Sequence, residues 1–264
     1  MNSFFDGMPP PENLQPTEVK QSPLDRLKSM TANGESERMK EQMMEDVFVM
    51  KDIAILGQWT TIYAPPNAGK TLLTIWMLKE AVEAQLINGE SIYYINADDT
   101  FKGGQEKLEM AEKVGFQMII PDINGFKVSE LVSLMSDLSE SNQANGVVIV
   151  LDTLKKFTNL MDKNSSARFG VVARSFVQSG GTLICLAHVN KKKGDDGKSI
   201  RAGTSDIQDD CDCSYIIEVL AKEACGLGEK STIEFRNEKS RGDTATTMAF
   251  KYEKVSGTGY SGLF

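Results

Sequence analysis

The chain has 264 residues, of which 41% are hydrophobic and 25% are charged, and its formal net charge is −8. This length and composition suit one large globular domain with appendages. No apolar run reaches the roughly 18 residues of a membrane-spanning helix, and the N-terminus lacks the features of a signal peptide, so we expect a cytoplasmic protein with no membrane partner. The acidic balance argues against nucleic acid coating the whole surface, but it is compatible with a local basic channel.

The four cysteines have no common zinc-binding spacing, and the chain has a single histidine to assist them. We therefore expect reduced structural thiols rather than a metal or redox site. They are Cys185, Cys211, Cys213 and Cys225.

The N-terminal part differs from the rest in composition. Residues 1–22 are polar and proline-rich, which predicts a disordered tail. Residues 23–46 are rich in Met, Glu, Lys and Arg and predict a helical arm, packed either on its own domain or on a neighbouring subunit. The main domain is expected at 47–254, followed by a C-terminal tail at 255–264.

The central part of the chain alternates between strand and helix patterns, which predicts an α/β fold with a mainly parallel central sheet and helices on both faces. The expected strands lie near 58–63, 91–96, 118–120, 147–151 and 182–188, and the expected helices at 70–86, 104–114, 128–140 and 166–178. The last third shows strand patterns without a clear helix, so we expect antiparallel strands that extend one edge of the sheet. These lie at 214–219, 232–237 and 244–252.

Residues 64–71 read Ala-Pro-Pro-Asn-Ala-Gly-Lys-Thr between an expected strand and an expected helix. A strand, a small-residue loop ending in Gly-Lys-Thr and a helix form a P-loop, which binds nucleotide phosphates; Ala64 stands where the motif usually has its first glycine. Lys70 can reach the β- and γ-phosphates, and the Thr71 hydroxyl can bind Mg²⁺. The other expected contacts to the nucleotide are Pro66, Asn67, Ala68, Gly69 and Leu72.

Acidic residues follow two of the expected strands. Asp152 ends the apolar strand 147–151, where a carboxylate beside a P-loop typically holds Mg²⁺. Thr153 follows it, so a general base must come from elsewhere, and Asp98 or Asp99 after strand 91–96 can orient the attacking water. His188 ends strand 182–188, where it either senses the γ-phosphate or has a structural role.

With these motifs in order, the chain resembles the RecA-like P-loop ATPases, and within them the RepA-type hexameric replicative helicases of plasmids and phages. The resemblance covers about residues 47–254 and implies a RecA-like core that uses ATP and Mg²⁺ in a homo-oligomer, a hexameric ring. It also implies single-stranded DNA as a partner, together with other replication or recombination proteins. In that family a glutamate activates water, and Asp98 stands in its place here.

The resemblance also implies a basic residue that completes the site of a neighbouring subunit. Such a residue is called a finger. Lys239 and Arg241 resemble one version of it, and Arg201 resembles another. We favour the first pair, since a planar guanidinium on a tight hairpin suits phosphate contact. The alternative for all three is ordinary surface charge.

Two segments are locally basic in this acidic chain. Residues 155–168 and 190–201 each carry a net charge of +3. The corresponding loops in RecA-like proteins bind single-stranded DNA, so we expect contacts to the phosphate backbone that weaken with salt. The alternative is solvated loops without a partner. The expected contacts are Lys155, Lys156, Lys191, Lys192 and Lys193.

The sequence therefore favours a ring-forming ATPase that acts on single-stranded DNA as a replicative helicase does. Two alternatives stay open. One is a recombinase or annealing ATPase that forms filaments on single-stranded DNA, and the other is an ATP-dependent loader or regulator that binds only protein.

Overall fold

The computed structural model describes residues 22–42, 47–226 and 228–255. It divides into two compact units, Met1–Met44 and Glu45–Phe264. The described part of the first unit holds two short helices, α1 (Pro23–Ser29) and α2 (Ser36–Gln42), and the Ser22 side chain caps α1 by accepting a hydrogen bond from the Asp25 amide. The expected tails at 1–22 and 255–264 fall almost entirely outside the described residues.

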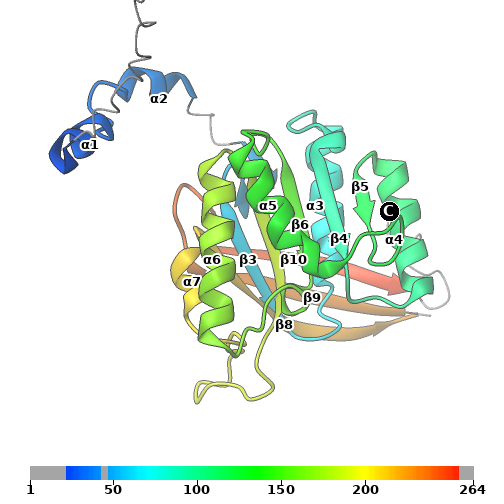
Figure 1. The fold of residues 1–264 in the computed structure, drawn as a ribbon. Coiled ribbons are helices and arrows are strands. Elements are labelled where there is room, and N and C mark those ends of the chain that lie inside the picture. Colours follow the sequence, from blue (N-terminus) through cyan, green and yellow to red (C-terminus); the bar gives the residue numbers. More distant parts are fainter. Residues whose placement is uncertain (1–21, 43–46, 227, 256–264) are drawn as a thin grey trace, which may run out of the picture. The chain divides into compact units, whose positions relative to one another are not determined.

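The second unit is built around an eight-stranded sheet with the order β10-β9-β8-β3-β7-β6-β4-β5 (Figure 1). From β8 to β5 all neighbouring strands are parallel, whereas β8, β9 and β10 pair antiparallel. The expected α/β fold class is thereby confirmed, including the antiparallel C-terminal extension. The strands are β3 (Trp59–Ala64), β4 (Ile92–Asn96), β5 (Gln117–Ile119), β6 (Val148–Asp152), β7 (Thr182–His188), β8 (Cys213–Cys225), β9 (Gly228–Lys239) and β10 (Thr247–Val255).

Helices cover both faces of this sheet, and each face has its own apolar core. One core joins the sheet to the helices α3 (Lys70–Glu83) and α4 (Phe101–Val114). The other joins it to α5 (Leu131–Glu140), α6 (Lys163–Gln178) and the short α7 (Asp206–Asp210). Strands buried on both sides explain the uninterrupted apolar runs, such as the fully buried β6.

Smaller elements complete the unit. A two-stranded hairpin of β1 (Phe48–Met50) and β2 (Ala54–Ile55) precedes β3. Three short 3₁₀ turns, η1 (Gly89–Ser91), η2 (Val128–Glu130) and η3 (Leu154–Lys156), lie between longer elements.

Two helices begin about three residues earlier than their apolar periodicity predicts. The Thr100 hydroxyl accepts a hydrogen bond from the Gly103 amide at the start of α4, and the Asp162 carboxylate accepts one from Asn164 at the start of α6. These side chains satisfy amides that have no partner inside the helix, so the first turn forms without contributing to the apolar face.

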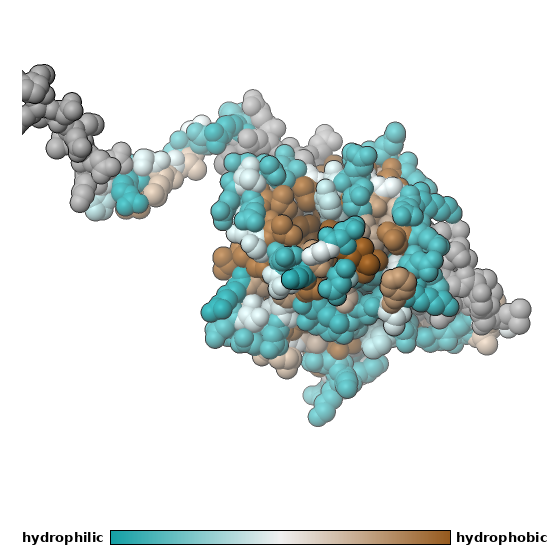
Figure 2. Space-filling model, turned by 45° about the vertical axis from the view of Figure 1, so that its right-hand side comes forward, coloured by the Kyte–Doolittle hydropathy of each residue, from teal (hydrophilic) through white to brown (hydrophobic). Residues whose placement is uncertain are grey.

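The described helices include none that is long and apolar enough to cross a membrane. The face in Figure 2 shows hydrophilic residues around apolar ones that gather over the middle of the domain.

The topology places different residues at the two ends of the parallel strands, which are named the P-loop edge (C-terminal ends) and the opposite edge (N-terminal ends). The parallel strands β3, β7, β6 and β4 all end at one edge, where residues 64–71, His188, Asp152 and Asp98 follow them. The turn between β9 and β10 lies at the opposite edge, since Lys239 pairs with Ser214, which in turn pairs with Thr61 near the start of β3. The fold thus separates the P-loop from the expected finger within one chain.

Candidate nucleotide site

The P-loop leads from β3 into α3 through backbone that only a few residue types adopt readily. Asn67 and Gly69 have positive φ angles of 58° and 79°, and Gly69 precedes the first turn of α3 without a side-chain cap. The unsatisfied amides of that turn and the helix dipole favour an anion there. Ala64 is the last residue of β3, and extended backbone accepts alanine, so the departure from the usual glycine is tolerated.

Gly69 also lies close to an aromatic ring from β10, the strand at the antiparallel end of the sheet order. A Cβ added to Gly69 would lie 2.9 Å from the Cζ and hydroxyl oxygen of Tyr252 on β10. Any side chain at position 69 would therefore meet both an unfavourable φ and this ring. Sequence reasoning missed Tyr252, because nothing in a strand pattern indicates contact with a loop some 180 residues earlier.

The P-loop lysine and threonine meet Asp152 in a buried cluster. Lys70 Nζ lies 2.9 Å from Asp152 Oδ1, and the Thr71 and Tyr94 hydroxyls donate to Asp152 Oδ2 over 2.7 and 2.8 Å. Burial favours the neutral acid, but Lys70 and then Lys107 outweigh it and hold the pKa of Asp152 below its ordinary value. Asp152 is thus an ionised carboxylate beside the Thr71 hydroxyl.

A second buried lysine, which sequence reasoning did not single out, contributes to the same cluster. Lys107 comes from the sheet-facing side of α4, and its side chain is 4% exposed. Its ammonium pairs with Asp99 and lies 3.9 Å from Asp152 Oδ2. Because an unpaired buried ammonium is costly, these carboxylates are what allow a lysine on that face. Asp99 therefore points toward the buried cluster.

Asp98 points the other way, toward the surface end of the strands. Its carboxylate lies 3.4 Å from Lys155 Nζ, 3.4 Å from Lys156 Nζ and 3.6 Å from His188 Nε2. Burial raises its pKa, but Lys155 and then Lys156 outweigh this, so the pKa of Asp98 lies below its ordinary value. Burial, followed by Lys70 and Lys155, lowers the pKa of His188 despite Asp98, which leaves the imidazole neutral at pH 7.

The residues present fit a magnesium nucleotide. The Thr71 hydroxyl and an ionised carboxylate lie 2.7 Å apart, and oxygen ligands of this kind are what Mg²⁺ prefers. The uncapped start of α3 offers backbone amides to phosphate oxygens, and Lys70 lies in the same cluster. Among the positions expected to contact the nucleotide, Pro66 to Leu72, Lys70 and Thr71 contact Asp152 directly.

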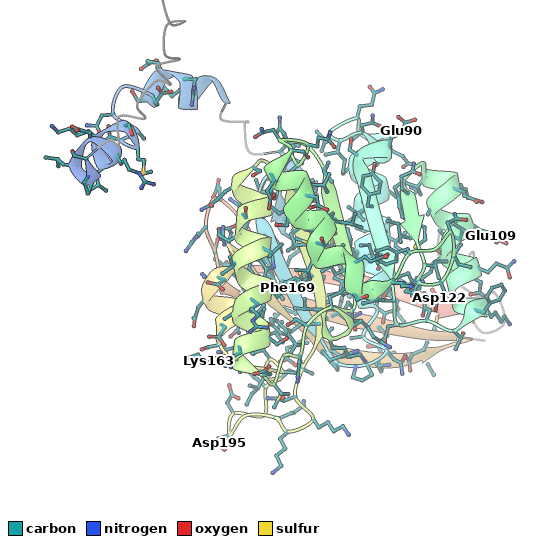
Figure 3. The ribbon with its side chains drawn as sticks, viewed as in Figure 1. Glu90, Glu109, Asp122, Lys163, Phe169 and Asp195 are labelled. Carbon is teal, nitrogen blue, oxygen red and sulfur yellow. The ribbon has the colours of Figure 1, made fainter. Side chains whose placement is uncertain are left out.

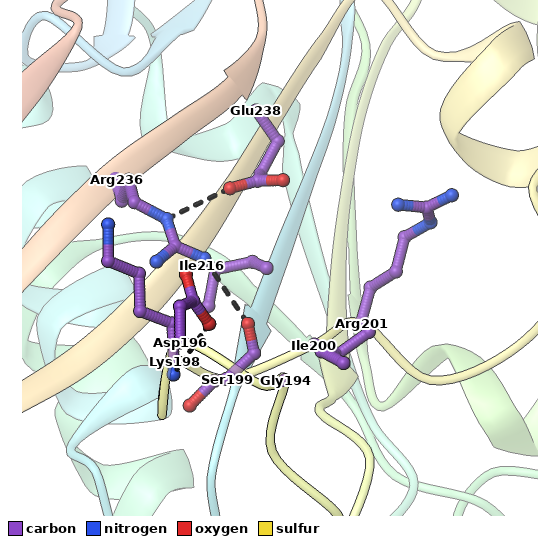
Figure 4. Close-up of a pocket in the computed structure, with 9 residues that line it drawn as sticks. All are labelled: Gly194, Asp196, Lys198, Ser199, Ile200, Arg201, Ile216, Arg236 and Glu238. Carbon is purple, nitrogen blue, oxygen red and sulfur yellow. Dashed lines mark hydrogen bonds and ion pairs between the residues drawn. The ribbon is translucent and has the colours of Figure 1, made fainter.

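The basic segment 190–201 lies at the same edge as the P-loop. Lys191, Lys192 and Lys193 are exposed, and Asp195 marks a loop that projects from the body of the domain (Figure 3). The segment also borders an open pocket of about 460 Å³, in which Arg236 contacts Glu238 and the carbonyl of Ser199 (Figure 4). Arg201 pairs with Val189, directly after His188, in a short antiparallel bridge in which the Ala202 amide donates to the His188 carbonyl and the Asn190 amide to the Ile200 carbonyl.

The other two finger candidates are held at the opposite edge of the sheet. Lys239 Nζ donates to the carbonyls of Gln208 and Asp209 in α7 over 2.7 and 2.6 Å. Arg241 pairs with Asp212 over 3.1 Å, and its side chain is 57% exposed. Asp212 also accepts from Arg174 and from the Trp59 amide, so it anchors this edge. Neither candidate is close to the P-loop of its own chain.

The site is thus that of an α/β protein with a P-loop, a strand-end aspartate and two further carboxylates beside them. No family model matches the chain, and a search of curated proteins found no match. Among solved structures, the chain is similar to a crystal structure of the RadB recombinase, with 16% sequence identity and a TM-score of 0.47. That similarity covers 76% of this chain and 88% of the other.

Proposed function

We propose that this chain is a RecA-like ATPase that hydrolyses MgATP as an oligomer, forms a ring and acts on single-stranded DNA as a replicative helicase does. The observation that carries the proposal is the meeting of Lys70, Thr71 and Asp152 within hydrogen-bond distance at the edge where the P-loop lies. Lys70 and Thr71 begin α3, whereas Asp152 ends β6, 81 positions after Thr71. Binding of phosphate together with Mg²⁺ explains why these three side chains lie together.

Each residue has a definite task in this proposal. The amides of residues 67–72 and the Lys70 ammonium bind the phosphates. When the nucleotide binds, Lys70 leaves its ion pair with Asp152 and contacts phosphate oxygens instead. Thr71 and Asp152 hold Mg²⁺, which when bound neutralises phosphate charge and polarises the reacting phosphoryl group. Asp98 accepts the proton of the attacking water, and the neutral His188 beside it is placed to report the state of the γ-phosphate.

Asp98 is the preferred general base of the two neighbouring aspartates. Asp99 is engaged with the buried Lys107, whose ammonium is fixed by α4. Asp98 instead lies beside His188 at the end of β7, the strand next to β3 and its P-loop. We therefore assign Asp99 a positioning role in the buried cluster and leave water activation to Asp98.

An oligomeric site is supported by the placement of Lys239 and Arg241. They lie at the edge of the sheet opposite their own P-loop, so they can reach phosphate only in a neighbouring subunit. Arg201 is paired with Val189 at the P-loop edge, which suits a role within its own chain better. We therefore propose Lys239 and Arg241 as the residues that complete a neighbour's site.

Single-stranded DNA as a partner is supported by two basic segments at the P-loop edge. Lys155 and Lys156 follow β6, and Lys191 to Lys193 follow β7. Both segments therefore begin beside the proposed nucleotide site, where a change of nucleotide can shift them. Exposed lysines of this kind contact phosphates without reading sequence.

The test is steady-state ATP turnover by the full chain and by Lys70→Ala, each with and without single-stranded DNA, combined with negative-stain images. We expect DNA-stimulated turnover that Lys70→Ala abolishes, and closed rings. Open helices would instead indicate a filament-forming recombinase or annealing protein. A turnover rate indifferent to DNA would indicate a loader or regulator that binds only protein, and turnover unaffected by Lys70→Ala would refute the proposal.

A further inference from the structure

Asp98 has an unusual set of neighbours for a general base. Two lysines from the segment after β6 lie 3.4 Å from its carboxylate oxygens, one on each oxygen, and His188 lies 3.6 Å away. Lys155 and Lys156 are the same side chains that a basic segment at this edge would offer to a polyanion. The structure therefore gives two uses to one pair of ammonium groups.

Pairing with Asp98 and binding a polyanion compete for the same positive charges of Lys155 and Lys156. An ammonium that pairs with Asp98 has its positive charge neutralised, so it attracts a phosphate group less strongly. A carboxylate between two ammonium groups is in turn a weaker proton acceptor than a free one, because the cations stabilise its ionised form. The low pKa of Asp98 agrees with this.

These ion pairs are of a kind that exchanges readily. The Lys155 and Lys156 side chains are 46% and 43% exposed, and Asp98 is 29% exposed. Ion pairs between solvent-exposed side chains contribute little net stability, and phosphate oxygens are strong competitors for a lysine. The pair Lys107–Asp99, one residue away, is buried on the lysine side and offers no such access.

We propose that Lys155 and Lys156 form a clamp on Asp98, and that the phosphate backbone of a single-stranded nucleic acid releases Asp98 by taking the two lysines. The strand is thereby sensed at the general base itself. This inference rests on the proposed ATPase function for its effect on turnover. Its binding half does not, because competition between Asp98 and a phosphate backbone takes place without ATP.

The binding half is tested with a dye-labelled oligo(dT) strand at low salt and without nucleotide, by fluorescence anisotropy. Freeing the lysines from Asp98 tightens DNA binding, because each partner opposes the other by the same factor. We expect Asp98→Asn to bind about three- to tenfold more tightly than the wild type. Asp99→Asn is the matched control, since it changes the net charge equally but leaves the clamp intact.

The turnover half compares the wild type with a Lys155→Ala, Lys156→Ala double variant. The two changes are on exposed side chains, so the fold is retained. We expect basal ATP turnover to rise about three- to tenfold and further stimulation by oligo(dT) to be lost. Lys102→Ala on the exposed side of α4 removes a positive charge that lies outside the clamp and outside both basic segments, and its basal turnover should be unchanged.

Several results would overturn the clamp. Asp98→Asn binding no more tightly than the wild type would do so, as would Asp99→Asn tightening equally or an absence of DNA binding in both proteins. Basal turnover that falls in the double variant would mean that the lysines position Asp98 for catalysis, and unchanged basal turnover would mean that they do not restrain it. Failure of the ATPase proposal is recognised separately, by turnover that survives Lys70→Ala.

Discussion

The two edges of the sheet carry polar clusters of opposite design. At the P-loop edge, Lys70, Lys107 and Asp152 are almost fully buried, and their charges balance only together with that of Asp99. At the other edge, Asp212 anchors Arg174 and the exposed Arg241. A buried set of charges is costly unless a ligand uses it, whereas an exposed guanidinium on an anchored turn is available to another molecule. We propose on this basis that one edge binds the substrate and the other serves a neighbouring subunit.

The largest effect is expected from removing the P-loop lysine, which tests whether the P-loop edge binds the substrate. Lys70→Ala should lower ATP turnover about 1000-fold, because a positioned charge at the developing phosphate charge is lost. Steady-state phosphate release measures it. The matched control is Lys79→Ala on α3, whose partly exposed side chain pairs with Glu80 and Glu83, and this variant should retain turnover. Equal turnover in the two variants would contradict the assignment.

The buried character of the P-loop edge is tested by Lys107→Ala. Removing one member of a buried ion-paired set leaves the carboxylates of Asp99 and Asp152 undercompensated, so the free energy of unfolding should fall by about 3 kcal/mol. Denaturant unfolding measures the change. Lys102→Ala, on the exposed side of the same helix, should stay within about 0.5 kcal/mol of the wild type. A Lys107→Ala protein as stable as that control would show that the pairing contributes little.

The opposite edge is tested by Arg241→Ala, which should lower turnover about 100-fold in the oligomer without changing nucleotide affinity. The sharper measurement mixes subunits. Arg241→Ala chains keep an intact P-loop and Lys70→Ala chains keep an intact finger, so a mixed oligomer contains some complete sites. Turnover in the mixture should exceed that of either variant alone, and a mixture no better than its components would place Arg241 outside the neighbour's site.

Much of this arrangement follows from the sequence. The alternation of apolar runs predicts the α/β sheet, and the Gly-Lys-Thr loop and Asp152 meet as their motifs require. What the sequence does not reveal depends on long-range register. Lys107 lies in an amphipathic helix, where a lysine ordinarily faces solvent, and only the neighbouring strand ends explain its burial. Asp212 gains its role from partners 29, 38 and 153 residues away in the chain, and Tyr252 gains its role from contact with a loop in the first third of the chain.

The basic segments also show what sequence reasoning cannot predict, namely which residue from another part of the chain pairs with a given side chain. Local charge identifies Lys155 and Lys156 as exposed cations, which they are, but it does not reveal that Asp98 lies between them. The division of labour between Asp98 and Asp99 likewise depends on which way each side chain turns after β4, and adjacent aspartates look equivalent in a sequence.

The smallest effect expected is on acid stability. The pKa of Asp152 is depressed in the folded protein, so its ion pairs contribute stability fully above the ordinary carboxyl pKa of 3.8 and lose it as the pH falls through the folded value. Between roughly pH 5 and pH 3 the wild type should lose about 1 kcal/mol more than Asp152→Asn does. Denaturant unfolding at several pH values measures this. Parallel losses in the two proteins would show that Asp152 is not selectively stabilised as a carboxylate.

The most direct test of the central claim is a crystal structure of the full chain with magnesium and a nonhydrolysable ATP analogue. We expect the phosphates to lie against the amides of residues 67–72, the Lys70 ammonium to move from Asp152 to phosphate oxygens, and Thr71 and Asp152 to hold Mg²⁺. A structure with the nucleotide bound elsewhere, or with Lys70 still paired to Asp152 beside an empty loop, would contradict it.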